Sequence, residues 1–283
     1  MASLAIKSHA KVNVGLQIRN KRSDGFHNIH TIFQELELHD TISLRLQDSG
    51  CSFTSNVSWL RNDVSNLCVR AWEHLSKYYD IGGVSIDLTK SIPAGSGLGG
   101  GSSNAASVIK GLVKLYKIDI SEKELHSIAT SLGADVSFFL DGGLQQGDGI
   151  GEKLTRLPGV INGVYLLIIP NFHISTDWAY KSYKIFLDEG RDQVNFAGFL
   201  NRDIVPFEFF ENDFESIVVP AYPEIGKIKK KLEAFGSRFA SLSGSGSTVY
   251  GIFDDESNAI SAESYFSPKY TTFITYPRVS NNL

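Results

Sequence analysis

A glycine-rich segment at residues 93–103 constrains this chain more than any other part of its sequence. It reads Pro-Ala-Gly-Ser-Gly-Leu-Gly-Gly-Gly-Ser-Ser and lies between a short apolar stretch, Val84–Leu88, and a long stretch with helical periodicity. Glycines let backbone N–H groups converge on an anion without a Cβ in the way, and a helix start adds unpaired donors and partial positive charge. Ser102 and Ser103 could add hydroxyl contacts to phosphate or Mg²⁺. The segment therefore predicts a phosphate-binding loop.

Two other kinds of phosphate loop fit the segment less well. No Gly-Lys-Ser/Thr ends it, so it is not a Walker A loop. Gly95, Gly97 and Gly100 satisfy the G-x-G-x-x-G pattern, and Asp119 follows about twenty residues later, as in dinucleotide-binding units. In such units, however, the acidic residue ends a second strand, whereas Asp119 lies between a helical stretch and a helix start at Ser121. A nicotinamide-dependent oxidoreductase stays as an alternative, and so does a module that binds ATP without catalysis.

The N-terminal part of the chain has the two-residue periodicity of β-strands. Apolar side chains alternate with smaller or polar ones over Val12–Ile18, which predicts a strand that begins with Lys11. Two further strands are predicted over Thr31–Leu38 and Thr41–Leu46, separated by a turn at His39–Asp40.

Helical periodicity follows the glycine-rich loop. Apolar residues recur at three- and four-residue spacing over residues 105–116. Ser121 with Glu124 forms a capping box for the next helix, which Gly133 can end. Asp135 comes just after that glycine, so we expect its carboxylate at a helix end.

The other predicted elements are shorter. They are helices over Asn66–Tyr79 and Pro223–Phe235, a helical stretch near Thr176–Leu187, and strands over Val84–Leu88, Val164–Ile169 and Thr271–Thr275. A second glycine loop, Ser241–Thr248, lies between two predicted strands. Taken alone it is typical of a hairpin turn, but its amides could also close a binding site.

Length and composition exclude several classes of protein. The chain has 283 residues, 42% of them hydrophobic, and its glycines and prolines cluster near residues 155–163, so we expect two domains, residues 1–157 and 158–283. A net charge of −4 argues against binding nucleic acid, because phosphate backbones need clustered cations.

Cys51 and Cys68 lack metal-ligand spacing and are expected as reduced thiols. The strongest apolar run, Val164–Ile169, is too short to cross a membrane. We expect a cytoplasmic protein that does not bind membranes.

Asp135 and Lys11 are the candidate catalytic residues. Asp135 precedes the apolar residues Val136, Phe138, Phe139 and Leu140, and a carboxylate in such surroundings needs a partner or has a raised pKa. Lys11 is a possible partner, and the pair could keep the carboxylate ionised beside an acceptor hydroxyl. Alternatively, Lys11 is an ordinary strand-edge lysine and Asp135 a helix-end cap.

Three segments together resemble the GHMP kinase superfamily. They are Ala10-Lys-Val-Asn13, residues 93–106 and Leu242-Ser-Gly-Ser-Gly-Ser-Thr248. Two further motifs add to the likeness: Arg22-Ser-Asp-Gly-Phe-His27 and Gly133-Ala-Asp-Val-Ser-Phe-Phe139. The resemblance spans roughly residues 6–253. The resemblance implies an α+β fold with an N-terminal domain like ribosomal protein S5 domain 2 and a ferredoxin-like C-terminal domain. It also implies a monomer or weak homodimer that uses ATP and Mg²⁺ to phosphorylate an alcohol. The details favour a small-molecule substrate, a cytidine diphosphate-linked polyol, over mevalonate or homoserine.

The resemblance assigns roles to individual residues. Lys11 and Asp135 would be the catalytic pair, and Ser103 would be a ligand of Mg²⁺. The ATP-binding residues would be Asn66, Lys90, Pro93, Ala94, Gly95, Ser96, Gly97, Leu98, Gly99, Gly100, Gly101, Ser102 and Ser103. The substrate-binding residues would be Asn13, Phe26, His27, Thr176, Tyr180, Gly244 and Ser245.

In the members of the superfamily that act on a cytidine diphosphate-linked polyol, an aromatic residue followed by histidine holds the cytosine ring. The resemblance assigns this role to Phe26 and His27, with Tyr180 as a second stacking face. The family usually has tyrosine in place of Phe26, so stacking is kept and a hydroxyl contact is lost. Ser137 replaces a usual proline, and Gln145–Gln146 replaces a more apolar pair.

Overall fold

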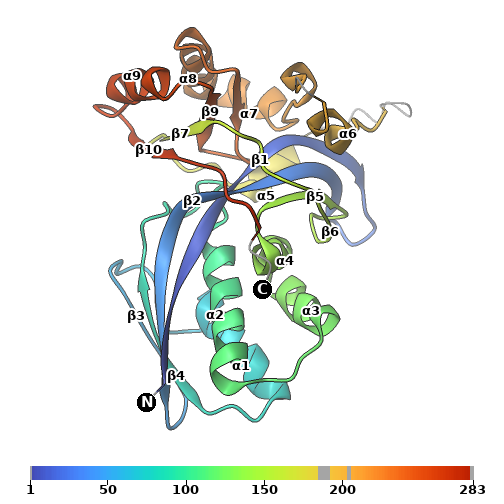
Figure 1. Ribbon diagram of the computed structural model, residues 1–283. Coiled ribbons are helices and arrows are strands. Elements are labelled where there is room, and N and C mark those ends of the chain that lie inside the picture. Colours follow the sequence, from blue (N-terminus) through green and yellow to red (C-terminus); the bar gives the residue numbers. More distant parts are fainter. Residues whose placement is uncertain (1, 184–191, 203–204, 281–283) are drawn as a thin grey trace. The chain divides into compact units, whose positions relative to one another are not determined.

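The computed structural model describes residues 2–183, 192–202 and 205–280 (Figure 1). It shows a mixed α+β protein with two sheets, as the sequence predicts. The chain forms two compact units. Unit 1 comprises Met1–Ala10, Leu38–Ala94 and Gly99–Asp141, and unit 2 comprises Lys11–Glu37, Gly95–Leu98 and Gly142–Leu283. The long strands β1 (Ser3–Lys21) and β2 (His27–Gln47) contribute residues to both units. The domain boundary near residue 157 stays a prediction.

Unit 1 contains a small sheet and four helices. Strand β4 (Gly83–Thr89) pairs antiparallel with residues 41–47 of β2 and parallel with β3 (Cys51–Ser55). The helices are α1 (Leu67–Tyr78), α2 (Gly100–Tyr116), α3 (Glu122–Leu132) and α4 (Ala134–Asp141), and α2 packs against the other three.

The predicted helix starts in unit 1 are confirmed. The side chain of Asn66 accepts a hydrogen bond from the backbone N–H of Cys68, and that of Ser121 accepts one from the N–H of Glu124. These bonds satisfy N–H groups that have no partner inside the helix.

The predicted turn at His39–Asp40 is wrong, because β2 continues through both residues. Asp40 is fully buried, and its carboxylate is a hydrogen-bond acceptor inside unit 1. Its donors are the backbone N–H groups of Ser91 (2.7 Å) and Ile92 (2.8 Å), the Lys90 Nζ (2.6 Å) and the Asn104 Nδ2 (2.9 Å). A polar residue that suggests a solvated turn in the sequence is therefore a buried anchor for the chain that leads into the glycine-rich loop.

Two catalytic candidates occupy different positions from those predicted. Lys11 lies in the middle of β1 rather than at its start, within the run Ser8–Ile18, which is buried at every position. Asp135 lies in the first turn of α4 rather than at the end of α3, because the chain re-enters a helix directly after Gly133. A carboxylate is favoured in a first helical turn by the partial positive charge there.

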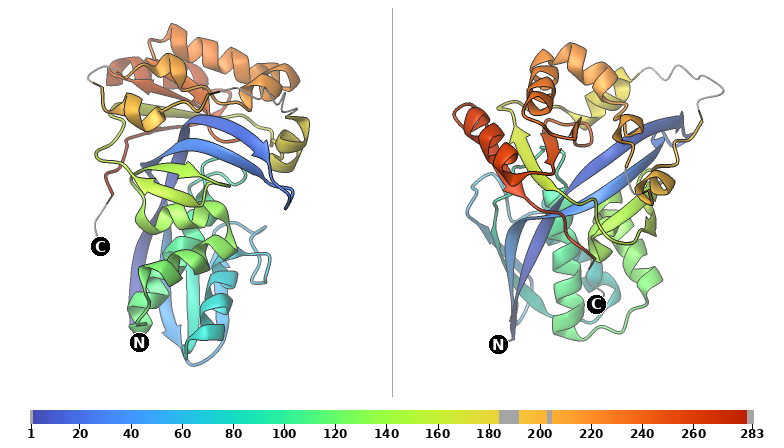
Figure 2. Two further views of the ribbon diagram at one scale, coloured as in Figure 1. Left: turned by 90° about the vertical axis from the view of Figure 1, so that its right-hand side faces the viewer. Right: turned by 45° about the horizontal axis from the view of Figure 1, so that its top comes forward.

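Unit 2 contains a four-stranded antiparallel sheet in the order β10-β7-β9-β8. Its strands are β7 (Val164–Ile169), β8 (Phe239–Leu242), β9 (Val249–Phe253) and β10 (Thr271–Thr275). Helix α8 (Pro223–Ala234) connects β7 to β8 after several shorter elements, and α9 (Glu256–Phe266) connects β9 to β10. Both helices cover the same face of the sheet (Figure 2). This βαββαβ order confirms the predicted ferredoxin-like fold.

The rest of unit 2 is built from short elements. Strand β5 (Leu144–Asp148) pairs with residues 31–34 of β2 and with β6 (Lys153–Arg156). The connection from β7 to β8 also contains the helices α5 (Thr176–Ser182), α6 (Phe196–Leu200) and α7 (Glu215–Ala221) and the 3₁₀ turn η1 (Phe207–Phe209). The predicted helical stretch near residues 176–187 is observed as α5, and its residues 184–187 lie outside the described part.

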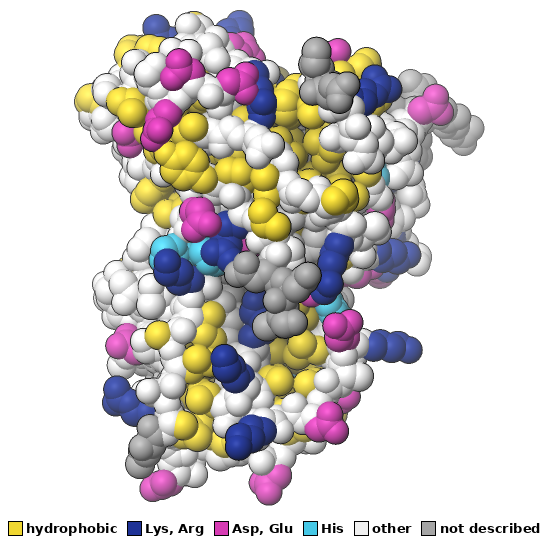
Figure 3. All heavy atoms as spheres, viewed as in Figure 1, with side chains coloured by type: hydrophobic (Ala, Val, Ile, Leu, Met, Phe, Trp, Pro, Cys, Tyr) yellow, Lys and Arg dark blue, Asp and Glu magenta, His cyan; other side chains and the backbone are white. Residues whose placement is uncertain are grey.

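The two cysteines are free thiols, as predicted. Burial raises the pKa of Cys51 to about 11 and that of Cys68 to about 12, so both are protonated at neutral pH. Across the described residues, no helix combines the length and apolar character that a membrane crossing needs. Basic and acidic side chains are interspersed on the face shown in Figure 3.

We expect Asp40→Ala to lower the free energy of unfolding by about 3–5 kcal/mol, because removing one partner of a buried ion pair leaves the Lys90 ammonium without compensation. Urea denaturation followed by circular dichroism measures this. Asp87→Ala is the matched control, since Asp87 is exposed on β4, and it should change the free energy by less than about 0.5 kcal/mol. Equal effects of the two substitutions would show that the Asp40 network does not stabilise the protein.

Candidate functional site

The two glycine-rich loops lie against each other in unit 2. The Ser243 hydroxyl donates to the carbonyl oxygen of Gly97 (2.9 Å), and the Thr248 N–H donates to that of Ser96 (3.1 Å). Gly97 has a φ of +83°, and a Cβ at this position would overlap the backbone oxygen of Ser243. Only glycine allows two backbones to come this close. The second loop does connect β8 to β9 as a hairpin, and it also supports the first loop.

Strand β1 presents Lys11 and Asn13 beside the same two loops. The backbone N–H of Lys11 donates to the carbonyl oxygen of Leu98 at 3.0 Å. A Cβ added to Gly244 would lie 3.4 Å from the Asn13 Oδ1 and 4.0 Å from the Lys11 Nζ. Three segments that the sequence analysis selected, from three distant parts of the chain, therefore meet within one compact unit.

A chain of buried hydrogen bonds orients the Lys11 ammonium. Its Nζ donates to the Asn13 Oδ1 (2.7 Å), the Asn13 Nδ2 donates to the Thr31 Oγ1 (3.0 Å), and the Thr31 hydroxyl donates to the carbonyl oxygen of Gly15 (2.7 Å). Because the Thr31 hydrogen is used on a carbonyl, its oxygen must accept from Asn13, which turns the Asn13 oxygen toward Lys11. Thr31 could not be predicted from the sequence, because a threonine in a strand carries no signal of this role.

Lys11 itself is only 4% exposed, and its Nζ lies 5.2 Å from the centre of the Phe33 ring. A buried ammonium needs such partners, since removing it from water is costly. Asp135 is partly exposed and belongs to unit 1, whereas Lys11 belongs to unit 2. The pairing of these two residues stays a prediction.

The second half of the first loop starts helix α2 in unit 1. Gly99 is the N-cap, with a φ of +71°, and it has no side chain to accept from the first-turn N–H groups. A helix start of this kind is a ready site for an anion. Ser102 is partly exposed and Ser103 is buried, so the two hydroxyls differ in access to a ligand.

Two predicted ATP-binding residues, Lys90 and Asn66, have structural roles in unit 1. The Lys90 side chain is bound to Asp40 and, at 3.4 Å, to the Asn104 Oδ1, and a Cβ on Gly100 would lie 3.1 Å from its Nζ. The Lys90 side chain therefore packs against the first residue of α2. Asn66 caps α1 and also donates to the carbonyl oxygen of Arg61 (3.1 Å). Their contact with adenine stays a prediction.

Four of the predicted substrate-binding residues form two contacts in unit 2. The hydroxyls of Thr176 and Ser245 are 2.9 Å apart. The rings of His27 and Tyr180 stack, with centroids 5.2 Å apart and planes at 13°. Phe26 is 60% exposed, so its ring is open to solvent.

His27 is expected to be neutral at neutral pH. Burial, and to a smaller extent the Lys21 ammonium, lower the pKa of His27 below its usual value. A neutral imidazole offers one donor and one acceptor, which suits the edge of a nucleobase.

His173 is another residue that the sequence analysis missed. Its Nδ1 lies 3.0 Å from the carbonyl oxygen of Gly95, and because a carbonyl can only accept, this nitrogen carries the hydrogen. A Cβ on Gly95 would come within 2.9 Å of the imidazole. His173 therefore occupies the space that the first loop leaves at Gly95.

The described residues contain no group of three or more His, Cys, Asp or Glu side chains that could hold a metal ion. Mg²⁺ bound with nucleotide phosphates needs few protein ligands, because it keeps several waters and takes phosphate oxygens. A single serine hydroxyl at the start of α2 fits such a site. Ser103 as that ligand stays a prediction.

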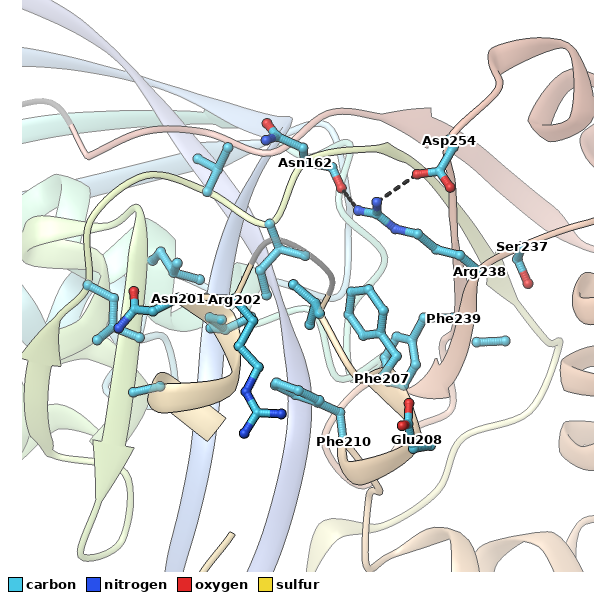
Figure 4. Close-up of a pocket in the computed structure, with 18 of the residues that line it drawn as sticks. Asn162, Asn201, Arg202, Phe207, Glu208, Phe210, Ser237, Arg238, Phe239 and Asp254 are labelled. Atoms are coloured by element: carbon cyan, nitrogen blue, oxygen red, sulfur yellow. Dashed lines mark hydrogen bonds and ion pairs between the residues drawn. The ribbon is translucent and has the colours of Figure 1, made fainter. Parts of the chain in front are cut away.

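A cavity of ≈ 940 Å³ lies elsewhere in unit 2 (Figure 4). It is lined by residues that include Phe207, Phe239 and Arg238, and none of the predicted site residues is among them. Arg238 is already paired with Asp254 at 2.6 Å and with the carbonyl oxygen of Asn162. None of the described residues that line this cavity is a glycine, so it lacks the glycine-rich backbone of the candidate site.

Two family models match the chain. "GHMP kinases N terminal domain" matches residues 66–143, and "GHMP kinases C terminal" matches residues 199–271. A 4-diphosphocytidyl-2-C-methyl-D-erythritol kinase of Chlorobium luteolum is 40% identical over 285 residues, which cover 99% of each chain. The chain belongs to the GHMP kinase family. The resemblance seen in its sequence motifs is confirmed, and the oxidoreductase alternative is set aside.

Other relatives and solved structures agree with this membership. A relative of the same name from Chlorobaculum tepidum is 38% identical and covers 97% of this chain and 98% of its own. The crystal structure of a 4-(cytidine 5'-diphospho)-2C-methyl-D-erythritol kinase aligns with a TM-score of 0.83 at 29% identity, covering 99% of this GHMP kinase and 100% of that chain. A homoserine kinase from Cytophaga hutchinsonii, at 19% identity and a TM-score of 0.71, shares the fold. The predicted GHMP kinase fold is confirmed.

We expect Gly97→Ala to lower the free energy of unfolding by about 2–5 kcal/mol, since it adds left-handed backbone strain to an overlap with the Ser243 backbone. Thermal and urea unfolding measure the change. Gly101→Ala is the control: its Cβ would lie 3.9 Å from the Leu67 Cδ1 and it is in the first turn of α2. It should be neutral or stabilising by up to about 1 kcal/mol. A Gly97→Ala protein as stable as Gly101→Ala would contradict the close approach of the two loops.

Proposed function

We propose that this GHMP kinase transfers the γ-phosphoryl group of ATP to the 2-hydroxyl of 4-diphosphocytidyl-2-C-methyl-D-erythritol, in the non-mevalonate route to isoprenoid precursors. The observation that carries the proposal is the meeting of Lys11, Asn13 and both glycine loops, in a chain 40% identical over its full length to a kinase of that name. We further propose that it works in the cytoplasm as a monomer or weak homodimer.

The backbone of the first glycine loop and the start of α2 bind the ATP phosphates. Phosphoryl transfer needs little covalent help from a protein, and it depends on in-line positioning and on stabilising the developing charge. The N–H groups after Gly99 and the α2 dipole supply part of that stabilisation. The Ser103 hydroxyl would hold Mg²⁺ bound with ATP, and the ion would neutralise further phosphate charge.

Lys11 and Asp135 act on the acceptor hydroxyl. The Lys11 ammonium is held by Asn13, which Thr31 orients, so it is a fixed positive charge that stabilises the developing alkoxide. Asp135 accepts the proton of the hydroxyl as a general base. Asn13 lies on the same strand and contacts the substrate beside Lys11.

The cytosine end of the substrate is recognised by aromatic residues. The exposed Phe26 ring provides a stacking face, and His27, backed by Tyr180, meets the edge of the base. Cytosine presents an amino donor next to ring acceptors, and one nitrogen of a neutral imidazole can accept from or donate to one of these groups. Thr176, Gly244 and Ser245 complete the substrate side.

A substrate panel tests the proposal directly. The purified protein with ATP and Mg²⁺ should phosphorylate 4-diphosphocytidyl-2-C-methyl-D-erythritol with a higher kcat/KM than mevalonate or homoserine. Thermal shift with ATP and with NAD serves as a binding control, and only ATP should stabilise the protein. Faster turnover of mevalonate or homoserine would refute the substrate, and ATP binding without any phosphorylated product would refute catalysis.

We expect Asp135→Asn to lower kcat about 10²–10⁴-fold, because the amide cannot accept the hydroxyl proton. Steady-state kinetics with the cytidine substrate measure this. Asp141→Asn, at the other end of α4, is the matched control. Asparagine keeps the size of this partly buried side chain, which lies 3.4 Å from the His126 Nε2, so activity should stay within about threefold. A loss below tenfold at Asp135 would reduce it to a positioning residue.

A further inference from the structure

Residues Asn212–Glu215, with the sequence Asn-Asp-Phe-Glu, form a short segment after η1 that ends in the first residue of α7. The first three side chains are 4%, 7% and 2% exposed. Two of these are polar and nearly buried, and such groups need partners. The partners of the four side chains lie on β1, at the second glycine loop, on α8 and in or next to α5, and several of these parts belong to the candidate site.

The backbone of this segment is attached to β1. The N–H of Leu16 donates to the carbonyl oxygen of Glu211, and the N–H of Asp213 donates to that of Leu16, both at 2.8 Å. Leu16 and Asn212 thus form a parallel bridge. The attachment point is on the same strand as Lys11 and Asn13, so the segment has a fixed position relative to the catalytic candidates on β1.

Asn212 and Glu215 hold the entry of the second glycine loop from both sides. The Asn212 Nδ2 donates to the carbonyl oxygens of Leu242 (2.8 Å) and Gly244 (2.9 Å). The Glu215 Oε1 accepts from the N–H of Leu242 and from the Ser241 hydroxyl, both at 2.9 Å. The N–H and the C=O of Leu242 are therefore both bound by side chains of this segment.

The remaining bonds keep these two side chains in place. The Asn212 Oδ1 accepts from the N–H of Phe214 at 3.0 Å, which fixes the orientation of the amide. The Glu215 Oε2 accepts from the Lys229 Nζ at 2.6 Å. Because Gly244 lies against Asn13 and Lys11, the position of this loop affects the surroundings of the Lys11 ammonium.

Asp213 and Phe214 contact the aromatic residues on the substrate side. The Asp213 Oδ2 accepts from the N–H of Ile18 (2.8 Å) and from the Tyr183 hydroxyl (3.0 Å). The Phe214 ring meets Tyr180 edge to face, with centroids 4.9 Å apart and planes at 82°. Tyr180 in turn stacks on His27.

We propose that Asn212–Glu215 is a positioning segment with two separable effects on the reaction. Asn212 and Glu215 set the second glycine loop beside Lys11 and Asn13, and so control kcat. Phe214, with Asp213, sets Tyr180 and through it His27, and so controls the KM of the cytidine substrate. This inference rests on the proposed function, and none of the four residues is assigned contact with the reacting atoms.

The kinetic test compares two substitutions. Asn212→Ala leaves two carbonyl oxygens without their donor, so kcat should fall about tenfold or more while the KM values of both substrates change less than about threefold. Phe214→Leu removes the ring edge under Tyr180, so the KM of the cytidine substrate should rise about five- to tenfold with kcat and the KM of ATP nearly unchanged.

Matched controls separate positioning from general loss of stability. Asn195→Ala removes another asparagine, the cap of α6, and Phe266→Leu trims a phenylalanine of the same buried core as Phe214, also 2% exposed. Both should lower the melting temperature without altering kcat or KM. If Asn212→Ala does not fold, Glu215→Gln tests the same effect, and it should lower kcat several-fold because it weakens the bond to Leu242.

Hydrogen–deuterium exchange provides a readout that needs no substrate. Asn212→Ala should speed exchange of the amides in residues 243–248, and Phe214→Leu should speed that in residues 176–182. If the unsubstituted enzyme does not phosphorylate the cytidine substrate, the proposed function fails, and the exchange pattern alone decides the positioning role. Kinetic and exchange changes that are the same in both variants, or no larger than in their controls, would overturn the inference.

Discussion

The close approach of two glycine loops is the constraint on which the candidate site depends. Gly97 and Ser243 come from distant parts of the chain, and their backbones are near enough that a single Cβ would separate them. Two hydrogen bonds, from Ser243 and Thr248, fix this approach. Because the loops are joined through backbone atoms, their N–H groups are arranged before a ligand arrives, and binding then costs less conformational entropy.

Buried polar side chains of the long strands β1 and β2 hold their neighbours in fixed positions through hydrogen bonds. Lys11, Asn13 and Thr31 form one chain of hydrogen bonds in unit 2, and Asp40 collects four donors in unit 1. Buried groups of this kind are costly unless every partner is present. They therefore hold their neighbours in one arrangement, which an apolar core of similar volume would not specify as sharply.

Elements with strong periodicity or clear caps could be predicted from the sequence, and the others could not. Helices α1, α2, α3 and α8 and strands β7 and β10 have regular apolar spacing or capping residues, and they are where the pattern placed them. Helix α7 was missed because it contains Pro220 and a run of β-branched residues. Helix α9 was missed because alanines make up most of its buried face. The turn at Asp40 was wrong because local chemistry cannot reveal that a carboxylate is buried by distant donors.

The sequence by itself predicted a phosphate-binding loop, because closely spaced glycines before a helix start are enough for local physical rules to interpret. The lysine and carboxylate for the acceptor and the aromatic residues for a base were predicted through the resemblance of the motifs to GHMP kinases. Only the tertiary structure decided that Thr31 orients Asn13, that His173 occupies the space at Gly95, and that Asn212–Glu215 holds the second loop. Those roles come from contacts between residues far apart in the chain, and no local pattern records such a contact.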